Sequence, residues 1–278
     1  MRDRAPEDRI QLLVSSLLQD TATLPARMGL MHGDMPVCDI LIFNQCDSMS
    51  QEKTVYPTGS VSVMNSPSRG VGLSRNTLLM HADAPLIMFA DDDIVYDPGF
   101  QDRIAEEFSA HPEADILLFN VEAAEGRRTY HNNSFGRVHL WNSGRYPAYA
   151  IGARRDSLIR SRVQFSLLFG GGAKYSNGED SLFLKDCLEA RLSIYKTPVC
   201  LGHEVQRPDD GNVSGSTWFE GYTDRFYHDR GVLYHFLYGP LALPMSFRFL
   251  LAHRDVRGGR RISDCLKLMR SGIREARE

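Results

Sequence analysis

An uninterrupted apolar run that ends in three consecutive aspartates constrains this chain more than any other feature. Leu86–Ala90 reads LIMFA, and Asp91, Asp92 and Asp93 follow it without a break. A short apolar run bounded by polar residues is typical of a buried strand, and open α/β sheets bind ligands at the carboxyl ends of such strands. Adjacent carboxylates repel one another, and their oxygens are ligands that Mg²⁺ and Mn²⁺ prefer. The pattern therefore predicts a divalent-cation site at a sheet edge, with a solvated acidic turn as the alternative.

Further apolar runs alternate with helix-like segments along the chain. Strands are predicted at 10–15, 39–44, 61–64, 115–121 and 193–200, and helices at 73–82, 102–110 and 180–190. Ser74 is predicted to open the first of these helices. Such alternation is typical of β-α units. We therefore expect an α/β fold with a Rossmann-like, mostly parallel central sheet flanked by helices.

Composition excludes several classes of protein. The 278 residues are 42% apolar and 24% charged, and 32 Lys and Arg against 35 Asp and Glu leave a net charge of −3. No overall positive field is available to hold nucleic acid, so no nucleic-acid partner is expected. Five cysteines without a C-x-x-C pair favour reduced thiols, and the amino-terminal residues lack the apolar core of a secretory signal. We expect a cytoplasmic protein that can also associate with the inner face of a membrane.

Two further segments place chemically active side chains next to predicted elements. Glu179 and Asp180 open a predicted helix, where a carboxylate serves as an N-cap or as a general base. His203 follows the last predicted strand, where an imidazole can complete a metal site. The glycine run 170–172 is predicted to form a turn or a mobile loop. Strand-end carboxylates, a helix-opening acid and a later histidine occur in an order that favours a catalytic interpretation over a purely structural one.

Three segments resemble the family 2 glycosyltransferases of the GT-A fold, which transfer a sugar from a nucleotide diphosphate donor. The stretch 69–76 (RGVGLSRN) resembles the arginine–asparagine helix start of that family, and 87–93 (IMFADDD) resembles its strand with the D-x-D motif. The stretch 178–183 (GEDSLF) resembles its later acidic motif. The order and spacing match over roughly residues 8–205. The resemblance implies a GT-A domain over 8–215 and a metal-dependent, inverting transferase of surface polysaccharide or glycan synthesis.

The resemblance also implies roles for individual residues. Asp180 is the implied catalytic base. The metal ion, Mn²⁺ or Mg²⁺, is expected to be held by Asp91, Asp93 and His203. The nucleotide sugar, with UDP favoured, is expected to contact Ser15, Asp47, Arg75, Asp91 and Asp92, and the acceptor side is expected near Gly171, Gly172 and Glu179. The implied acceptor is a glycan or a lipid-linked hydroxyl.

The segment after residue 215 differs in composition from the rest. Between Trp218 and Arg261 aromatic side chains lie among basic ones, and 248–278 holds nine Arg and Lys against four acids. Aromatic rings and arginines suit the surface of a membrane with anionic lipids. A helical subdomain whose aromatic side chains pack on the core explains the same composition. We expect a helical extension over 216–278, with peripheral membrane contact as one of two interpretations.

Two other functions explain parts of the pattern. A phosphatase of the haloacid dehalogenase type also carries Asp-x-Asp after an apolar strand, and Asp91 would then form an aspartyl phosphate. In that phosphatase family the aspartate pair comes near the start of the fold, whereas here it follows several predicted strands, which disfavours this alternative. A non-catalytic, GT-A-like binding or scaffold module is the other alternative, because the first strand ends in Ser15-Ser16-Leu17 where the family has a proline–threonine run.

Overall fold

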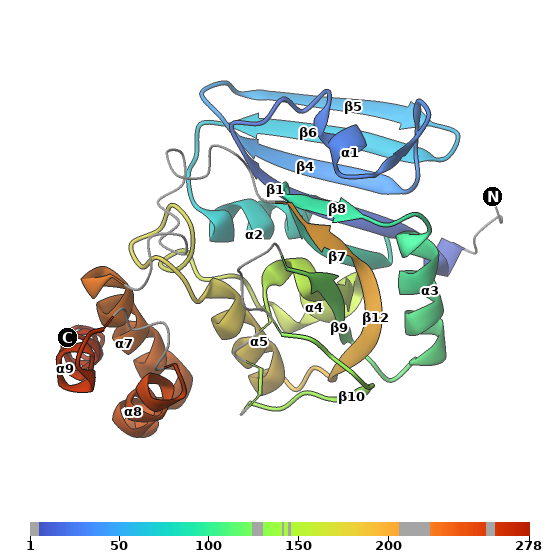
Figure 1. Cartoon of the computed structure of the whole chain (residues 1–278). Helices are drawn as coiled ribbons and strands as arrows, with labels where there is room; N and C mark the ends of the chain where they lie inside the picture. Colours follow the sequence, from blue (N-terminus) through green and yellow to red (C-terminus); the bar gives the residue numbers. More distant parts are fainter. Residues whose placement is uncertain (1–5, 124–129, 141, 144–145, 206–222, 254–258) are drawn as a thin grey trace.

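A central sheet of ten strands organises the molecule, which we describe from a computed structural model (Figure 1). The model describes residues 6–123, 130–140, 142–143, 146–205, 223–253 and 259–278. The strand order is β10-β12-β9-β11-β7-β1-β4-β6-β5, and β8 pairs with β12. Helices cover both faces of this sheet, and a group of C-terminal helices lies to one side. The predicted α/β fold is confirmed.

The middle of the sheet is parallel, as expected. Four neighbouring strands run in one direction: β7 (Leu86–Asp91), β1 (Ile10–Leu17), β4 (Asp39–Gln45) and β6 (Gly59–Ser66). A second parallel pair is formed by β9 (Ile116–Glu122) and β12 (Ile194–Glu204), and β11 (Ile151–Arg154) joins it to β7 with antiparallel pairing on both sides. The carboxyl ends of all six parallel strands therefore point to one edge of the sheet.

Antiparallel strands lie at the margins. They are β5 (Ser50–Tyr56) beside β6, and β8 (Ile94–Tyr96) and β10 (Gly136–Arg137) beside β12. A separate small hairpin consists of β2 (Met31–His32) and β3 (Met35–Pro36). β5 was not among the predicted strands because its residues are largely exposed and carry no apolar alternation.

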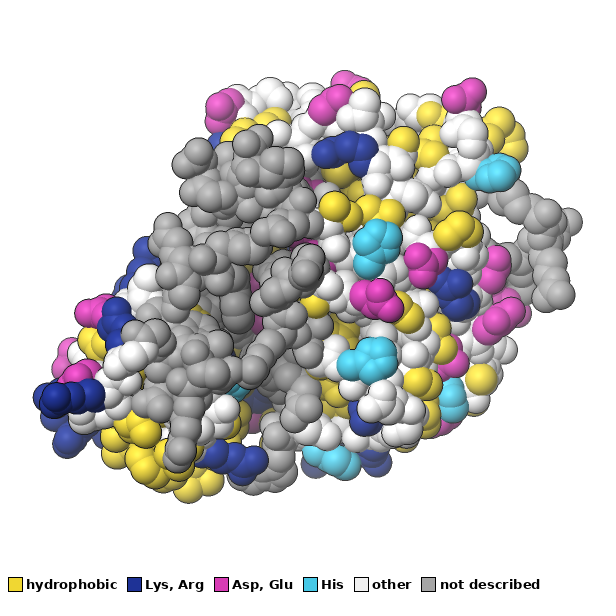
Figure 2. Space-filling model, viewed as in Figure 1, with side chains coloured by type: hydrophobic (Ala, Val, Ile, Leu, Met, Phe, Trp, Pro, Cys, Tyr) yellow, Lys and Arg dark blue, Asp and Glu magenta, His cyan; other side chains and the backbone are white. Residues whose placement is uncertain are grey.

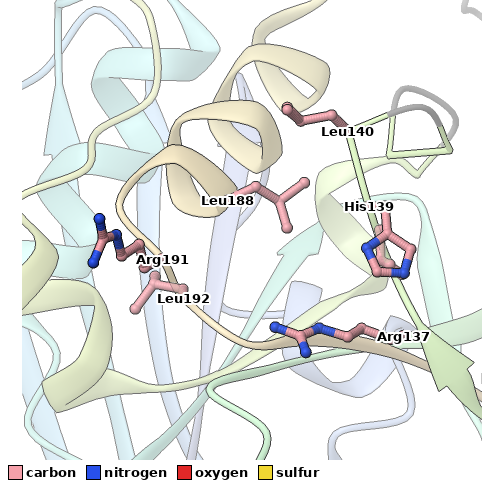
Figure 3. A pocket seen from close by; sticks show the side chains of 7 residues that line it. Arg137, His139, Leu140, Leu188, Arg191 and Leu192 are labelled. Atoms are coloured by element: carbon pink, nitrogen blue, oxygen red, sulfur yellow. The ribbon is translucent and has the colours of Figure 1, made fainter.

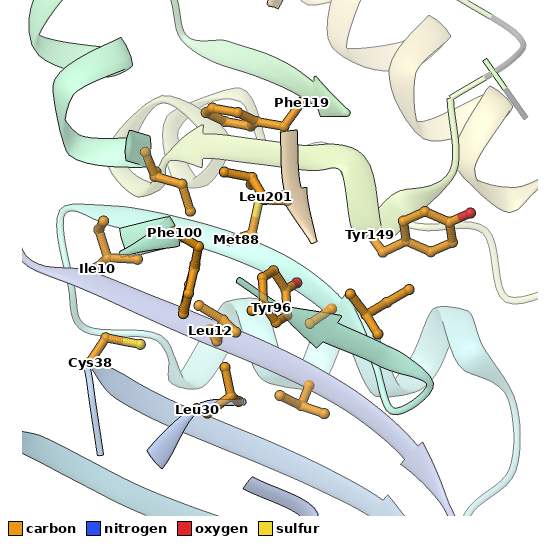
Figure 4. Close-up of a cluster of buried hydrophobic side chains, with 14 of the residues drawn as sticks. Ile10, Leu12, Leu30, Cys38, Met88, Tyr96, Phe100, Phe119, Tyr149 and Leu201 are labelled. Atoms are coloured by element: carbon orange, nitrogen blue, oxygen red, sulfur yellow. The ribbon is translucent and has the colours of Figure 1, made fainter. Parts of the chain in front are cut away.

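Alternating side chains of the central strands build two cores, one on each face. In β1, Ile10, Leu12 and Val14 join one cluster, which is shown in Figure 4, and Leu13 joins the other. The first cluster is covered by α1 (Leu24–Arg27), α3 (Phe100–Ala110) and β8. The second is covered by α2 (Val71–His81), α4 (Arg155–Ser161) and α5 (Glu179–Glu189). Because successive side chains of a strand point to opposite faces, strands covered on both sides read as continuous apolar runs.

The C-terminal part is helical, as predicted. It contains α7 (Asp224–Tyr238), the short 3₁₀ turn Gly239–Leu241, α8 (Ala242–Ala252) and α9 (Ile262–Glu275). These helices share a third core with Phe169, Tyr175 and Leu182 of the preceding part of the chain. The boundary expected between residues 215 and 216, and Trp218, lie outside the described residues.

Most of the aromatic side chains of this extension pack inside it. Phe226 and Tyr227 are almost fully buried, and the Arg230 guanidinium lies 4.9 Å from the Phe226 ring centroid and 5.1 Å from that of Phe249. The mixture of aromatic and basic residues therefore reflects internal cation–π packing to a large extent. Phe247 is an exception, with 46% of its surface exposed.

Two expectations about element ends are wrong. Helix α2 begins at Val71, after Gly70 with φ +117°, so Ser74 lies inside the helix and does not open it. Strand β12 continues to Glu204, because β8 pairs with its last residues. His203 therefore lies within the strand instead of following it.

The five cysteines, at positions 38, 46, 187, 200 and 265, form no disulfide with one another. Within the described part of the chain, no helix is both long enough and apolar enough to cross a bilayer.

Candidate active site

The carboxyl edge of the parallel strands collects most of the predicted site residues. Pairing aligns Ser15 of β1 with Asp91 of β7 and with Phe43 of β4, so the loops that follow these strands leave the sheet side by side. Asp92 lies in the turn after β7, and its Oδ2 accepts a hydrogen bond from the Leu17 backbone N–H at 3.2 Å. This contact ties the acidic turn to the end of β1.

Arg75 is the centre of the cluster at this edge. Its side chain is only 5% exposed, and its Nη2 donates to Asp91 Oδ1 at 2.8 Å while Nη1 donates to Glu179 Oε1 at 2.9 Å. Burial alone would lower the pKa of this guanidinium, but Asp91 and Glu179 together raise it above its ordinary value. Arg75, on α2, thus links the end of β7 to the start of α5. Arg75 and Glu179 are 104 positions apart in the sequence.

Asp180 lies next to this bridge in the first turn of α5. Burial raises the pKa of Asp180 to about 7; Glu179 adds to the rise, and Arg75 opposes it. The Ser181 backbone N–H donates to its Oδ1 at 3.0 Å. A carboxylate with a pKa near neutrality has the proton affinity that a general base needs at physiological pH.

Ser15 and Ser74 connect β1 to α2. The Ser15 hydroxyl donates to Ser74 Oγ at 2.8 Å, and both residues are buried. Ser74, which was expected to cap the helix, instead holds the predicted nucleotide-contacting Ser15 against α2. The family resemblance was the signal that pointed to Ser15.

Asp47 lies at the same edge but outside the buried cluster. It follows β4, its side chain is 92% exposed, and its Oδ1 is 2.9 Å from Nη2 of Arg69 in the loop before α2. An exposed ion pair of this kind contributes little to stability. Asp47 is accessible to a ligand, in keeping with its predicted place on the nucleotide side.

The three predicted metal ligands do not gather into one group. Asp91 ends β7 and Asp93 immediately precedes β8, whereas His203 is exposed on β12 opposite Val95. Among the residues that the structure describes, no three His, Cys, Asp or Glu side chains form a group suited to a metal ion. Mg²⁺ is often held by one or two carboxylates that share it with substrate phosphates, and Mn²⁺ accepts the same oxygen ligands. Asp91 and Asp93 therefore fit an ion that binds together with a phosphate ligand, and not a preformed three-ligand centre.

The glycine run 170–172 packs against the cluster. The Gly171 carbonyl accepts a hydrogen bond from the Val71 N–H at 2.9 Å, so the run lies on the start of α2. Gly170 has φ +99°, and a Cβ built there would lie 2.7 Å from the Glu179 carboxyl carbon. A side chain at this position would displace Glu179, which explains the need for glycine.

Asn44 is a site residue that the sequence analysis missed. It is buried near the end of β4; its Oδ1 accepts from the Gln19 backbone N–H at 3.1 Å, and its Nδ2 donates to the Gln19 carbonyl at 3.1 Å and to Asn65 Oδ1 at 3.0 Å. The amide thus fixes the loop after β1 at the edge of the sheet. A polar residue near the end of an apolar strand was the available signal.

Helix α7 holds the segment that leads into the acidic pair. Asp229, which is 3% exposed, accepts hydrogen bonds from the Ser176 backbone N–H at 3.0 Å and from its hydroxyl at 3.1 Å. A Cβ on Gly178 would lie 2.5 Å from a methyl carbon of Leu233, so α7 packs directly on the N-cap of α5. The C-terminal extension is therefore a support for Glu179 and Asp180. Nothing in the local sequence indicates this contact, because it joins residues 53 positions apart.

We expect Asp229→Ala to lower the turnover number by about tenfold to a hundredfold while leaving donor binding nearly unchanged, because a misplaced catalytic group loses rate more than affinity. Steady-state kinetics with a nucleotide-sugar donor would measure the turnover number and donor binding separately. Asp224→Ala removes an exposed carboxylate from the same helix and serves as the matched control. Equal losses of activity in the two variants would show that α7 has no positioning role.

A surface cavity of about 680 Å³ lies away from this cluster (Figure 3). It is lined by residues around β10 and by the connection from α5 to β12: Arg137, Val138, His139, Leu140, Leu188, Arg191 and Leu192. β12 starts beside this cavity and ends beside Asp93. The cavity and the acidic cluster therefore lie at opposite ends of this strand. The cavity does not belong to the candidate active site.

A mostly parallel sheet with a carboxylate cluster at its carboxyl edge is the arrangement expected of an α/β enzyme with the GT-A fold. Residues 46–166 match the family model described as Glycosyl transferase family 2. This segment contains Arg75 and the aspartates 91–93 and ends before Glu179. This segment thus resembles the family 2 glycosyltransferases, and the predicted enzyme class is confirmed.

Several solved structures have a fold similar to that of this chain. Staphylococcus aureus TarS 1–349 in complex with UDP-GlcNAc is similar with a TM-score of 0.60 and 14% identity, over 90% of this chain and 74% of that chain. The mannosyltransferase PcManGT from Pyrobaculum calidifontis, in complex with GDP-Man and Mn²⁺, is similar with a TM-score of 0.51 and 11% identity, over 99% and 78%. At these identities the likeness concerns the fold, which is GT-A as predicted, and this leaves the phosphatase alternative without support. No curated protein matches the chain.

Proposed function

We propose that this protein transfers a sugar from a nucleoside diphosphate donor to a hydroxyl acceptor with inversion at the anomeric carbon. The observation that carries the proposal is the Arg75 bridge, which brings Asp91 and the Glu179–Asp180 pair to one edge of the sheet. Two solved structures of the same fold were obtained with UDP-GlcNAc and with GDP-Man and Mn²⁺, which supports a donor of this kind. A UDP-sugar is the first donor to test.

In the proposed reaction Asp180 takes the proton of the acceptor hydroxyl as that oxygen attacks the anomeric carbon. The bond from this carbon to the diphosphate breaks, and its electron pair leaves with the nucleotide. Mn²⁺ or Mg²⁺, when bound by Asp91 and Asp93, supplies neutralisation of the charge on the departing diphosphate. Because attack and departure occur on opposite faces of the sugar, one displacement inverts the configuration.

The remaining site residues keep their predicted roles within this proposal. Ser15, Asp47 and Asp92 are proposed to contact the nucleotide, and His203 is proposed to approach the metal when the donor is bound. Gly171 and Gly172, beside Glu179, are proposed to border the acceptor. A glycan or lipid-linked acceptor, a role in surface polysaccharide synthesis and a cytoplasmic location remain predictions.

A thermal-shift screen tests donor binding. We expect the melting temperature to rise with one of the UDP-, GDP-, CMP- and dTDP-sugars only when Mn²⁺ or Mg²⁺ is present, since a ligand at a hundredfold its Kd stabilises the native state by about 2.7 kcal/mol. Asp91→Asn combined with Asp93→Asn should abolish this shift. Asp97→Asn, in the loop after β8, is the control and should retain it.

Three results would contradict the proposal in different ways. Metal-independent binding that survives the double substitution would place the donor elsewhere. Absence of a shift, of donor hydrolysis and of transfer with every donor would indicate a scaffold. A phosphate trapped covalently on Asp91 would indicate a phosphatase.

A further inference from the structure

Helix α8 carries apolar side chains both on its buried side and on the exposed side next to it. Ala242, Ser246 and Leu250 recur every four residues and are fully buried against the rest of the extension, and the Ser246 hydroxyl donates to the Ala242 carbonyl at 2.8 Å. On the outer side Leu243, Phe247 and Leu251 recur with the same spacing and are 41%, 46% and 37% exposed. We call these three residues the α8 stripe. An apolar stripe on the exposed side of a helix marks a surface suited to a further apolar partner.

The α8 stripe lies in a region without acidic side chains. From Gly231 to His253 the chain contains no Asp or Glu, and its one Arg, Arg248, is exposed beside Phe247. Leu241, just before the helix, is 48% exposed and extends the apolar surface. Figure 2 shows hydrophobic side chains gathered at the lower left of the molecule, where Figure 1 draws α8, with Lys and Arg side chains at their margin.

The net charge of the segment that contains the stripe favours one kind of partner. Residues 248–278 carry nine Arg and Lys against four acids, in a chain whose net charge is −3. A symmetric contact between two copies would bring two copies of this positively charged segment together, which is repulsive. A membrane that contains anionic lipids complements both the apolar stripe and the positive charge of this segment, of which Arg248 lies in α8 itself.

We propose that the α8 stripe docks the protein on the surface of a membrane that contains anionic lipids. The helix has 11 residues and is about 16 Å long, which suits a helix lying in the plane of the interface and not one crossing it. Leu243, Phe247 and Leu251 enter the boundary between headgroups and acyl chains, and Arg248 meets the lipid phosphates. This surface is separate from the carboxyl edge of the sheet, and the proposal does not depend on the proposed transfer reaction.

Vesicle flotation with the full chain, without nucleotide or acceptor, tests the proposal. We expect binding to vesicles of phosphatidylcholine with phosphatidylglycerol, weaker binding to phosphatidylcholine alone, and weakening by salt. Phe247→Ser combined with Leu251→Ser should reduce binding at least about tenfold, because the apolar surface that enters the lipid is lost. Val55→Ser combined with Met80→Ser removes apolar side chains that are even more exposed, 74% and 64%, from β5 and α2 and should bind like the wild type.

Melting temperatures of both double variants should match that of the wild type, so that a loss of binding is not a loss of folding. Absence of binding to the anionic vesicles, or equal binding by the stripe variant and the wild type, would overturn the proposal. Light scattering after size exclusion tests the alternative that a second copy of the chain binds the α8 stripe. A dimer that the stripe substitutions dissociate would make this face an interface between copies and would also overturn it.

Discussion

Asp180→Asn is expected to lower the turnover number by about 10²- to 10⁴-fold and to leave donor binding unchanged. The asparagine amide cannot take a proton from the acceptor hydroxyl, whereas its size and its contact with the Ser181 N–H are retained. Because burial raises the pKa of Asp180 to about 7, kcat/KM of the wild type should rise with pH and reach half its maximum near this value. This rise should be missing from the residual activity of the variant.

The same substitution is expected to stabilise the fold at neutral and alkaline pH. In the unfolded chain the Asp180 carboxyl ionises near pH 4, but in the folded protein it keeps its proton up to about pH 7. Wild-type stability therefore falls as the pH rises through this window, since the native state binds the additional proton. Asparagine has no such proton to lose. The free energy of unfolding of Asp180→Asn should exceed that of the wild type by at most about 4 kcal/mol above pH 7, and this difference should disappear toward pH 4.

Urea unfolding at pH 5 and pH 8 measures this effect without any substrate, and kinetics with the identified donor measure the turnover. Asp186→Asn removes a carboxylate from the far end of the same helix, where 48% of the side chain is exposed, and is the matched control. Full activity in Asp180→Asn would rule out the base assignment. A stability difference that does not change with pH would show that Asp180 is ionised in the folded protein at both pH values.

The central strands could be predicted because burial on both faces leaves a clear pattern. Leu86–Asp91 is almost entirely apolar up to its last residue, and the observed strand differs from the predicted one by a single residue. Burial in β5 is slight, so its sequence SQEKTVY carries no comparable signal. The end of β12 was missed for a related reason, because its last residues are held by pairing with β8 and not by an apolar run.

The candidate site could be predicted as a set of residues but not as a network. Three aspartates after a buried strand and two acids at a helix start identify where the chemistry lies. The ion pair of Arg75 with Glu179 and the hydrogen bonds of Asp229 with Ser176 depend on how distant segments pack, which a local motif does not contain. The metal prediction shows the same limit, since two of the three expected ligands flank one turn and His203 lies on another strand.

Arg75→Met is expected to destabilise the fold by about 3–5 kcal/mol at pH 8, because it removes the cation that two largely buried carboxylates share. The side chains of Asp91 and Glu179 are 28% and 13% exposed, so water solvates them only in part. Arg75 also lowers the pKa of Asp180, and without it this pKa should rise further above 7. The variant should therefore lose transfer activity at neutral pH even in the fraction that remains folded.

The pH dependence of this loss separates the ion pair from ordinary packing. As the pH falls toward 5, Asp180, whose pKa Arg75 lowers, is protonated with or without the arginine and no longer repels Glu179, so the stability deficit of Arg75→Met should shrink. Arg75→Lys keeps the charge but cannot span both carboxylates with two nitrogens, and an intermediate deficit is expected. Arg69→Met breaks the exposed pair with Asp47 and should cost less than about 1 kcal/mol at either pH. If the deficit of Arg75→Met were the same at pH 5 and pH 8, the arginine would act through its packing against Phe165, whose ring centroid lies 5.4 Å away, and not through the two carboxylates.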